Sequence, residues 1–152
     1  MTKAESMDPH LDAVTLAVAD LDAAVAFYRD GLGLPVGAVV GREYHDDTTG
    51  ADGTIAFVEL RGGAMLALYE RANLAKDAAV PDGARGPLEF SLVHVVDSRD
   101  EVDDLLARAA AAGATVTAPA HERPWGFYSA YFTDPDGHLW EVGSRLPAAA
   151  GG

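Results

Sequence analysis

The stretch FTDPDGHLWEV, residues 132–142, places a histidine, His138, three residues before a glutamate, Glu141. This spacing can hold a divalent metal when both residues lie on one face of a helix. Pro135 and Gly137 instead predict a turn, because proline presets φ and glycine accepts a positive φ. The Trp and Val that follow favour a strand, on which residues three apart face opposite sides. We therefore expect that His138 and Glu141 do not bind one metal ion.

The predicted strand after this turn has two different faces. Trp140 and Val142 share the face that we expect a helix to cover, whereas Leu139 and Glu141 share the other face. His138, at the exit of the turn, is expected to bond the backbone there. The stretch therefore predicts a hairpin whose last strand has a core-facing side and an acidic side.

Outward from this hairpin, the chain reads as a strand, a helix and three strands, twice over. FVELRGGAMLAL, residues 57–68, aligns position by position with YFTDPDGHLWEV, residues 131–142. Such internal self-similarity predicts a duplicated module. We expect a first module at residues 10–70, a linker at 71–87, a second module at 88–145, and tails at 1–9 and 146–152.

Capping residues predict where the two helices begin and end. Asp20 fits the N-cap of a first helix that ends at Gly31 or Gly33. In the second module, Ser98 and Glu101 fit a capping box at the start of the helix. Each helix therefore follows directly on the first strand of its module.

Composition and charge exclude several classes of partner. The chain has 152 residues, no cysteine and no apolar run of the roughly 20 residues that a membrane span needs. The first ten residues show no apolar core of a secretion signal, so a cytoplasmic location is the default expectation. The net charge is −13, from 24 acidic and 11 basic residues, which disfavours nucleic acid as a partner. A neutral or cationic small molecule is the easier partner.

The segment VTLAVADLDAAVAFYRDGLGLPV, residues 14–36, together with YFTDPDGHLWEV, resembles the vicinal-oxygen-chelate superfamily. That superfamily includes glyoxalase I, the bleomycin-resistance proteins and the extradiol dioxygenases, and the resemblance covers about residues 11–145. It implies an α+β fold in which two βαβββ modules form a curled, mixed eight-stranded sheet around a cleft, with the helices outside. It also implies a homodimer, in which modules are sometimes exchanged between chains.

The resemblance implies four metal-ligand positions, which fall on Ala13, Ala67, Ser91 and Glu141. Of these side chains only the Glu141 carboxylate can bind a hard cation, and a catalytic metal normally needs at least three protein ligands. We therefore expect no metal and no cofactor. This departure puts the superfamily's isomerase, dioxygenase and thiol-transfer activities in doubt for this chain.

Strand alternation predicts a mostly apolar cleft wall with a few polar points, as is usual for a small-molecule site. A sealed core is the alternative, but Glu141 argues against it because a buried carboxylate without a partner is costly. Aromatic residues in HERPWGFYSAY, residues 121–131, could stack on a planar ligand or pack against a second subunit. Arg123 could pair with Glu141 or with a ligand anion. The expected ligand-binding residues are Thr15, Met65, Tyr69, Ser91, Val93, Trp125, Tyr128, Leu139 and Glu141.

Three other histidines have weaker interpretations. His94 falls on the helix-covered face of its strand and is expected to be a core histidine. His45, which stands beside Asp46 and Asp47, could bind a cation. His121 lies at a strand end and could act as an acid–base group.

Three functions are compatible with these residues. The first is a metal-independent protein, similar to the bleomycin-resistance branch, that binds or sequesters a small hydrophobic or aromatic molecule, which could be cationic. The second is an enzyme: either a metal-dependent lyase, isomerase or dioxygenase with unexpected ligands, or an acid–base enzyme that uses Glu141. The third is a non-catalytic interaction module.

Overall fold

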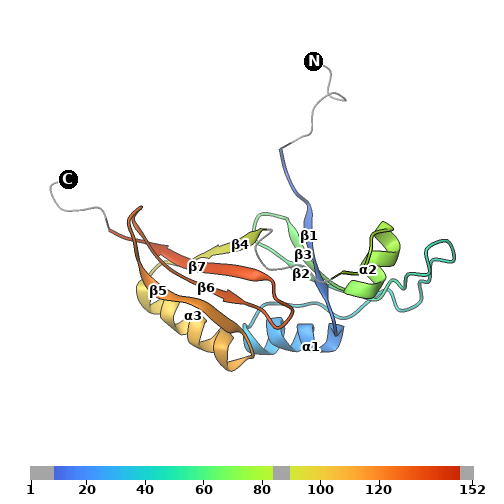
Figure 1. Ribbon diagram of the computed structural model, residues 1–152, viewed down its shortest axis with the longest axis horizontal. Coiled ribbons are helices and arrows are strands. Elements are labelled where there is room, and N and C mark those ends of the chain that lie inside the picture. Colours follow the sequence, from blue (N-terminus) through green and yellow to red (C-terminus); the bar gives the residue numbers. More distant parts are fainter. Residues whose placement is uncertain (1–8, 84–89, 148–152) are drawn as a thin grey trace, which may run out of the picture.

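The structure, a computed structural model, describes residues 9–83 and 90–147. Its elements follow the expected order of a strand, a helix and further strands in each half (Figure 1). The first half contains β1 (Ala13–Val18), α1 (Leu21–Val25), η2 (Ala26–Gly31), β2 (Ile55–Glu59), β3 (Met65–Glu70) and α2 (Arg71–Ala78). The second half contains β4 (Ser91–Val95), α3 (Arg99–Ala111), β5 (Thr115–Arg123), β6 (Phe127–Thr133) and β7 (Leu139–Arg145). The α+β class expected from the sequence is confirmed.

Each half forms one mixed sheet. In the first, the strand order is β1-β3-β2, with β1 parallel and β2 antiparallel to β3. In the second, the order is β4-β7-β6-β5, with β4 parallel to β7 and the other pairs antiparallel. The two sheets are curled and open, and they lie side by side above α1 and α3 in Figure 1. The matching strand orders are what a duplicated module would give.

The eight-stranded sheet of the expected fold is not continuous within one chain. The described residues form seven strands in two sheets. The segment between η2 and β2, where a further strand was expected, makes isolated bridges such as Val40 to Ile55. Gly41 follows with φ of 80°, and a Cβ there would overlap the carbonyl oxygen of Gly53. A backbone in this conformation cannot continue a regular ladder.

The helix ends follow the predicted caps, with one difference. Asp20 caps α1 by accepting a hydrogen bond of 3.0 Å from a backbone N–H three residues further on. Gly33, with φ of 75°, follows the end of η2. Ser98 caps α3 by accepting from the backbone of Glu101 at 3.2 Å. The Glu101 carboxylate accepts in turn from the backbone N–H of Asp97 at 2.7 Å, one residue earlier than a standard capping box.

The predicted linker begins with a helix. Its first eight residues form α2, and their sequence RANLAKDA contains neither Gly nor Pro, so a helix is favoured. The helix ends where Ala79 adopts a φ of 55°. Residues 84–87 of the linker lie outside the described part, as do residues 1–8 and 148–152 of the predicted tails. Among the described residues, no helix is long and apolar enough to cross a membrane.

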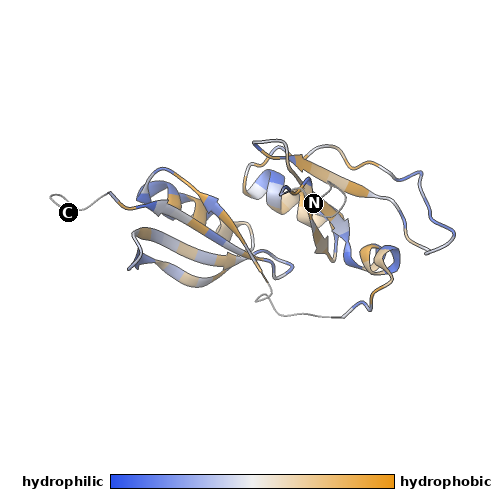
Figure 2. Cartoon of the chain, turned by 90° about the horizontal axis from the view of Figure 1, so that it is seen from above, coloured by the Kyte–Doolittle hydropathy of each residue, from blue (hydrophilic) through white to orange (hydrophobic). Residues whose placement is uncertain are grey.

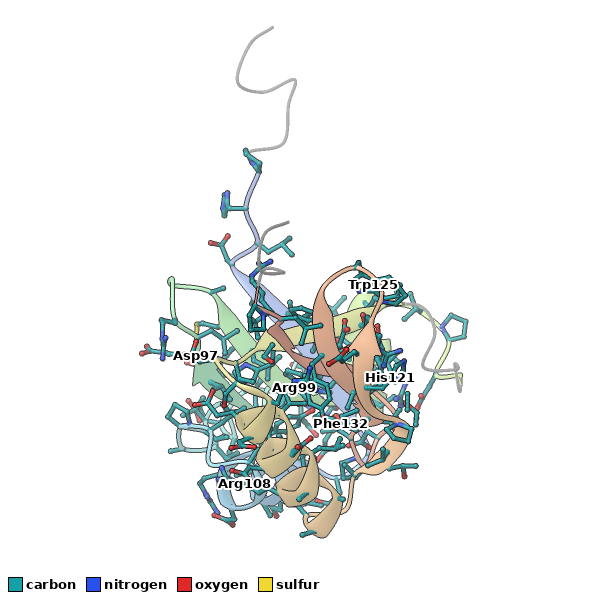
Figure 3. The ribbon with its side chains drawn as sticks, turned by 90° about the vertical axis from the view of Figure 1, so that its left-hand side faces the viewer. Asp97, Arg99, Arg108, His121, Trp125 and Phe132 are labelled. Carbon is teal, nitrogen blue, oxygen red and sulfur yellow. The ribbon has the colours of Figure 1, made fainter. Side chains whose placement is uncertain are left out.

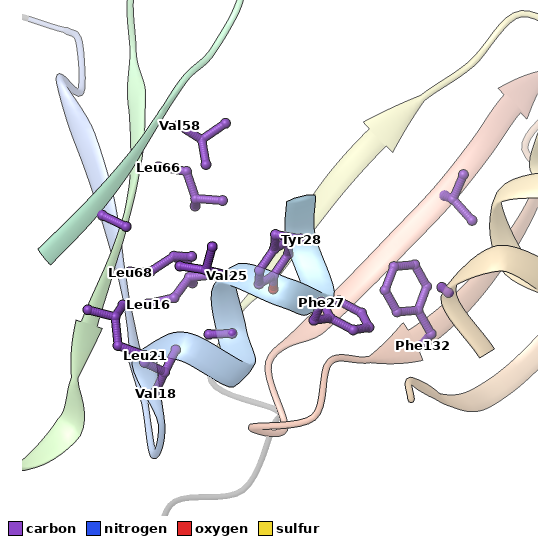
Figure 4. Close-up of a cluster of buried hydrophobic side chains, with 14 of the residues drawn as sticks. Leu16, Val18, Leu21, Val25, Phe27, Tyr28, Val58, Leu66, Leu68 and Phe132 are labelled. Carbon is purple, nitrogen blue, oxygen red and sulfur yellow. The ribbon is translucent and has the colours of Figure 1, made fainter. Parts of the chain in front are cut away.

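One hydrophobic core runs through both halves (Figure 4). Alternate residues of β1 and β3 pack against α1, while Phe132 and Val142 of the second sheet pack with α3. Figure 4 shows Phe27 and Tyr28 of η2 between these two groups. Trp140 packs against the same core, so the core-facing side predicted for the last strand is confirmed. Seen from above, hydrophobic stretches also follow the strands of both sheets (Figure 2).

Candidate functional site

The Asp-Pro-Asp-Gly turn between β6 and β7 holds the two modules together. Asp134 is only 3% exposed. Its carboxylate accepts hydrogen bonds from the Tyr28 hydroxyl at 2.5 Å and from the backbone N–H of His138 at 2.8 Å. The ring Nδ1 of His138 lies 2.6 Å from the same carboxylate and donates to it. Gly137 takes a φ of 90° in the turn, as the sequence predicts.

This turn gives His138 and Glu141 separate roles. The His138 ring bonds Asp134 before β7 begins, whereas Glu141 lies within β7 beside Tyr131 of β6. The expectation that His138 bonds the backbone is wrong for its ring, which bonds a side-chain carboxylate. The physical reason is that a buried carboxylate needs several donors, and the histidine ring supplies one of them.

The hydrogen bonds of this turn change the acidity of both buried partners. Burial by itself would raise the pKa of Asp134, but the hydrogen bonds from His138 and Tyr28 outweigh it and hold the pKa below its ordinary value. Burial, reinforced by the charge of Asp134, raises the pKa of Tyr28 well above its usual range. Asp134 is therefore an ionised, hydrogen-bonded carboxylate. Its role is structural, because it joins the two modules.

A different set of groups gathers on the face of the second sheet that α3 does not cover. Glu141 has Val93 of β4 on one side and Tyr131 of β6 on the other. Val93 is 56% exposed, while Glu141 and Tyr131 are half-buried. Burial raises the pKa of Tyr131, and so do the charge and the hydrogen bond of Glu141. We call this side, with Val93, Tyr131 and Glu141 at its middle, the open face of the second sheet.

Arg123 reaches onto this open face from the end of β5. Its Nε donates to the Ser129 hydroxyl at 3.1 Å and its Nη2 donates to the Ser129 carbonyl at 3.2 Å. The guanidinium carbon lies 5.6 Å from the centre of the Tyr131 ring, within cation–π range. Among the described residues, Arg123 forms no ion pair with Glu141, so the pairing considered from the sequence is replaced by these contacts.

A glycine makes room for an aromatic ring on the same face. A Cβ at Gly143 would overlap the Phe127 ring and would lie 2.9 Å from Cβ of Ser129. The Phe127 ring therefore lies over Gly143, and Phe127 is also the strand partner of Arg123. Arg145 of β7 lies opposite Phe127 and is exposed on the same side. The open face thus combines aromatic and aliphatic surface with a few charged groups, which is the composition of a small-molecule site.

The other expected ligand-binding residues lie in three places. Thr15, Met65 and Tyr69 belong to the first sheet, where the Tyr69 hydroxyl donates to the carbonyl of Asp52 at 2.5 Å. Ser91 and Leu139 lie beside each other on β4 and β7, near Glu141. Within one chain, the expected cleft residues are therefore divided between the two sheets.

The two aromatic residues expected at the cleft mouth differ in position. Trp125 is 74% exposed at the end of the β5–β6 hairpin (Figure 3). Tyr128 lies on the helix side of the sheet, where its hydroxyl donates to Asp103 at 2.7 Å and Arg99 lies 4.8 Å from its ring centre. Tyr128 and Glu141 are therefore on opposite sides of the second sheet, and the structure does not bring them together.

The four positions where the resemblance implies metal ligands do not fit a metal ion. Ala13 and Ala67 lie on the first sheet and have no donor atom, and Ala67 is only 2% exposed. Ser91 and Glu141, on the second sheet, supply one hydroxyl and one carboxylate. The part of the chain that the structure describes contains no group of three or more His, Cys, Asp or Glu side chains placed to hold a metal. We therefore derive no reaction step through a metal.

The remaining histidines lie in three different places. His94 is exposed, so its assignment to the core is wrong: β4 is an edge strand, and α3 packs on β5, β6 and β7 instead. His45 lies 2.7 Å from Asp52, and this hydrogen bond raises its pKa. The acid closest to His45 is therefore Asp52, and not its sequence neighbours Asp46 and Asp47. His121 is exposed and lies opposite Ser129 on the open-face side of β5, where its Nδ1 is 3.2 Å from a backbone carbonyl.

A shallow recess also lies on the helix side of the molecule. It has a volume of ≈ 510 Å³ and is lined by α1 and η2 on one side and by Ala112, Gly113 and Pro135 on the other. Its lining side chains are all apolar, so it offers no group for chemistry.

Tyr131 and Ser129 are not among the expected ligand-binding residues, and Phe127 was expected only as one of the aromatic residues at the cleft mouth. The turn contains the signal that finds Tyr131: Asp134 lies opposite His138, so counting three residues back from Asp134 and three forward from His138 pairs Tyr131 with Glu141. Ser129 and Phe127 share the alternation of Tyr131 on β6. No comparable signal indicates that Arg123 bonds Ser129, because β5 has register shifts on both sides of Ala118.

Comparisons with known proteins agree with this architecture. The family model of the Glyoxalase/Bleomycin resistance protein/Dioxygenase superfamily matches residues 10–142. The uncharacterized protein PA2024 of Pseudomonas aeruginosa is 33% identical to this chain, with 95% of each protein covered. A glyoxalase-related enzyme from Fulvimarina pelagi, known from a crystal structure, is 32% identical in sequence with a TM-score of 0.73. The match covers 90% of this chain and 88% of that enzyme's chain. Lactoylglutathione lyase from Agrobacterium tumefaciens is 29% identical, with a TM-score of 0.61, over 91% of this chain and 95% of its own.

Proposed function

This chain belongs to the Glyoxalase/Bleomycin resistance protein/Dioxygenase superfamily, and we propose that it binds or sequesters a small hydrophobic or aromatic molecule without using a metal ion. The observation that supports this most is the row Val93, Glu141 and Tyr131 across the open face. It places exposed aliphatic surface beside an adjacent carboxylate and phenol. Burial of an apolar ligand against such a surface, with a few polar groups to orient it, needs no reacting residue.

We also propose that a second copy of the chain closes the site. Phe90, Val93 and Val95 on and beside the edge strand β4 are each more than half exposed. The residues expected to face one ligand are divided between two sheets that lie side by side in one chain. A homodimer that brings the first sheet of one chain to the open face of the other would bury this apolar surface and form a cleft.

The experiment is a binding screen on the full chain. Aromatic and aliphatic molecules of each charge type are titrated into the protein, and binding is measured by calorimetry and by the shift of the thermal unfolding midpoint. We expect binding by ligands with an aromatic body. We expect Val93→Glu to abolish it, and the matched control Val80→Glu, which changes another exposed valine outside both sheets, to retain it. No binding by any aromatic ligand would contradict the proposal.

Two relatives favour an enzyme as the second candidate. The structures that resemble this chain at 32% and 29% identity are a glyoxalase-related enzyme and a lactoylglutathione lyase. In this chain Glu141, beside Tyr131, would be the group that moves a proton. Metal analysis of protein purified without chelators separates the candidates. A stoichiometric transition metal in the purified protein would show that the protein is not metal-independent. Turnover of a substrate by the metal-free protein, if it is lost in the Glu141→Gln variant, would support acid–base catalysis.

A further inference from the structure

The Arg123 guanidinium is held by hydrogen bonds on the open face, which also includes the exposed Arg145 opposite Phe127. Two hydrogen bonds to Ser129, at 3.1 and 3.2 Å, fix its Nε and Nη2, and its guanidinium carbon lies over the Tyr131 ring, 5.6 Å from the ring centre. Fixing a long side chain in this way costs conformational entropy. Because the cost is met before any ligand arrives, the guanidinium is preorganised for recognition.

This arginine also retains unused hydrogen-bond donors and an unneutralised charge. Within the described residues, Nη1 of Arg123 makes no hydrogen bond and no carboxylate lies within ion-pair distance of the side chain. A guanidinium has five N–H donors in a planar fork, so Nη1 and the second N–H of Nη2 remain available. Two parallel N–H groups of this kind match the two oxygens of a carboxylate.

A second arginine–tyrosine pair on the other side of the sheet shows the contrast. Arg99 lies 4.8 Å from the Tyr128 ring centre, but it also forms an ion pair with Glu122. Its charge is therefore satisfied within the chain. Arg123 has the same kind of ring contact without an acidic partner.

We propose that Arg123 binds the carboxylate of the ligand, so that the molecule taken up by the open face is an aromatic or aliphatic monocarboxylate. This inference rests on the proposed small-molecule function and names the chemical class of its ligand. The apolar body would lie over Phe127, Val93 and Val95, and Glu141 would accept a hydrogen bond from a ligand hydroxyl or ammonium further along the face.

An anionic ligand differs from the neutral or cationic ligand that the overall charge of −13 favours when only the sequence is considered. Local contacts take precedence for a bound molecule, because exposed charges beyond about 8 Å are largely screened at physiological ionic strength. Glu141 faces the same side, beside Tyr131, and its carboxylate would repel a second negative charge on the ligand. A single carboxylate is therefore more compatible with the face than a multiply charged anion.

The test uses three probes with one aromatic body: naphthoate, naphthylmethanol and naphthylmethylammonium. Each is titrated into the full-length wild-type protein by calorimetry at low and high salt. We expect naphthoate to bind roughly tenfold or more tightly than the alcohol, as a charge-assisted hydrogen-bonded pair would give. We expect high salt to reduce this advantage and to leave binding of the alcohol nearly unchanged.

Variants test whether Arg123 causes the tighter binding of naphthoate over the alcohol. Arg123→Met should remove it, and Arg123→Lys, which keeps the charge without the fork, should retain only part of it. The control Arg99→Met removes one positive charge from the opposite side of the sheet and should leave the preference for naphthoate intact. Thermal unfolding of each variant verifies that it is folded, and the salt dependence of the wild type tests the proposal without any variant.

The outcomes separate this inference from the proposed function. If the alcohol or the ammonium binds as tightly as naphthoate, or if Arg123→Met keeps the preference, the assignment of Arg123 is wrong while small-molecule binding stands. If none of the three probes binds, the proposed function fails and this inference fails with it.

Discussion

The hydroxyl of Tyr28 donates a 2.5 Å hydrogen bond to the carboxylate of Asp134, 106 residues further along the chain. Both side chains are almost completely buried, and they belong to different modules. Trp140 Nε1 donates to the same hydroxyl at 3.1 Å, so Tyr28 uses both its donor and its acceptor capacity. The backbone N–H of Ala19 extends the contact by donating to Asp136 at 2.8 Å. The turn that identifies the fold in the sequence therefore also joins the two modules.

Tyr28→Phe should destabilise the protein because it leaves a buried, ionised carboxylate with one donor fewer. We expect a loss of about 1–3 kcal/mol in the free energy of unfolding, measured by urea denaturation. The matched control is Tyr44→Phe, which removes a hydroxyl from an exposed ring and should change stability by less than about 0.5 kcal/mol. Equal effects of the two variants would contradict the role given to the Tyr28 bond.

Acid should weaken the protein through Asp134. Its pKa in the folded state is lowered, so its contribution to stability is present above the ordinary carboxyl pKa of about 4 and is lost as pH falls through the folded value. The stability difference between wild type and Asp134→Asn should therefore shrink as the pH is lowered from about 4 towards 2. Asp104→Asn, an exposed helix position, controls for the loss of one negative charge. A difference that stays constant over this pH range would argue against an ionised Asp134.

Signals that depend on near neighbours in the sequence predicted much of this structure. The turn at Pro135 and Gly137, the cap at Asp20 and the two sides of β7 all follow from local rules. Contacts that depend on which elements meet were not predictable in the same way. His94 faces the side that a helix was expected to cover, yet α3 does not extend over β4. The burial of a residue on an edge strand depends on the extent of the covering helix, and alternation contains no information about that.

The same distinction explains the candidate site. Glu141 is predictable from the sequence because it is a carboxylate on a mostly apolar face, which is a property of its own strand. The sequence predicts Tyr128 to be an aromatic residue near the cleft mouth. Alternation along β6, however, turns Tyr128 to the helix side of the sheet and Tyr131 to the other side. Arg123 bonds Ser129 across a hairpin with irregular register, so its role required the three-dimensional structure.

Gly31 and Ala112 form a close contact between η2 and the end of α3. A Cβ at Gly31 would lie 2.5 Å from Cβ of Ala112, which is closer than side chains pack. Gly31→Ala should therefore cost about 1–3 kcal/mol of unfolding free energy. The double variant Gly31→Ala/Ala112→Gly should recover most of this loss, because the new methyl group occupies the vacated space.

The control for this pair is Gly83→Ala, where a Cβ would meet no atom within 4 Å. It should leave the urea midpoint nearly unchanged. Additive losses in the double variant would show that the helix contact is not the cause of the destabilisation.

The proposed dimer should depend on the exposed valines of β4. We expect the wild type to sediment as a dimer in analytical ultracentrifugation and Val93→Glu to sediment as a monomer, because a buried charge without a partner opposes association. Val80→Glu, also at an exposed valine, should remain a dimer. A wild-type protein that is monomeric at all concentrations would rule out closure of the site by a second copy.

Restoring donors at two of the four family positions should create a metal site. Ala13 and Ser91 are exposed, so Ala13→His and Ser91→His should be tolerated, and together with Glu141 they would supply the three ligands that a zinc site requires. We expect zinc to raise the thermal unfolding midpoint of this double variant, and adding Glu141→Gln should abolish the effect. Ala13 lies on the first sheet while Ser91 and Glu141 lie on the second, so the gain requires the two sheets to face one another. If two chains supply them, the zinc effect should grow with protein concentration. An equal zinc effect in the wild type would mean that other residues already hold a metal, and metal independence would then be wrong.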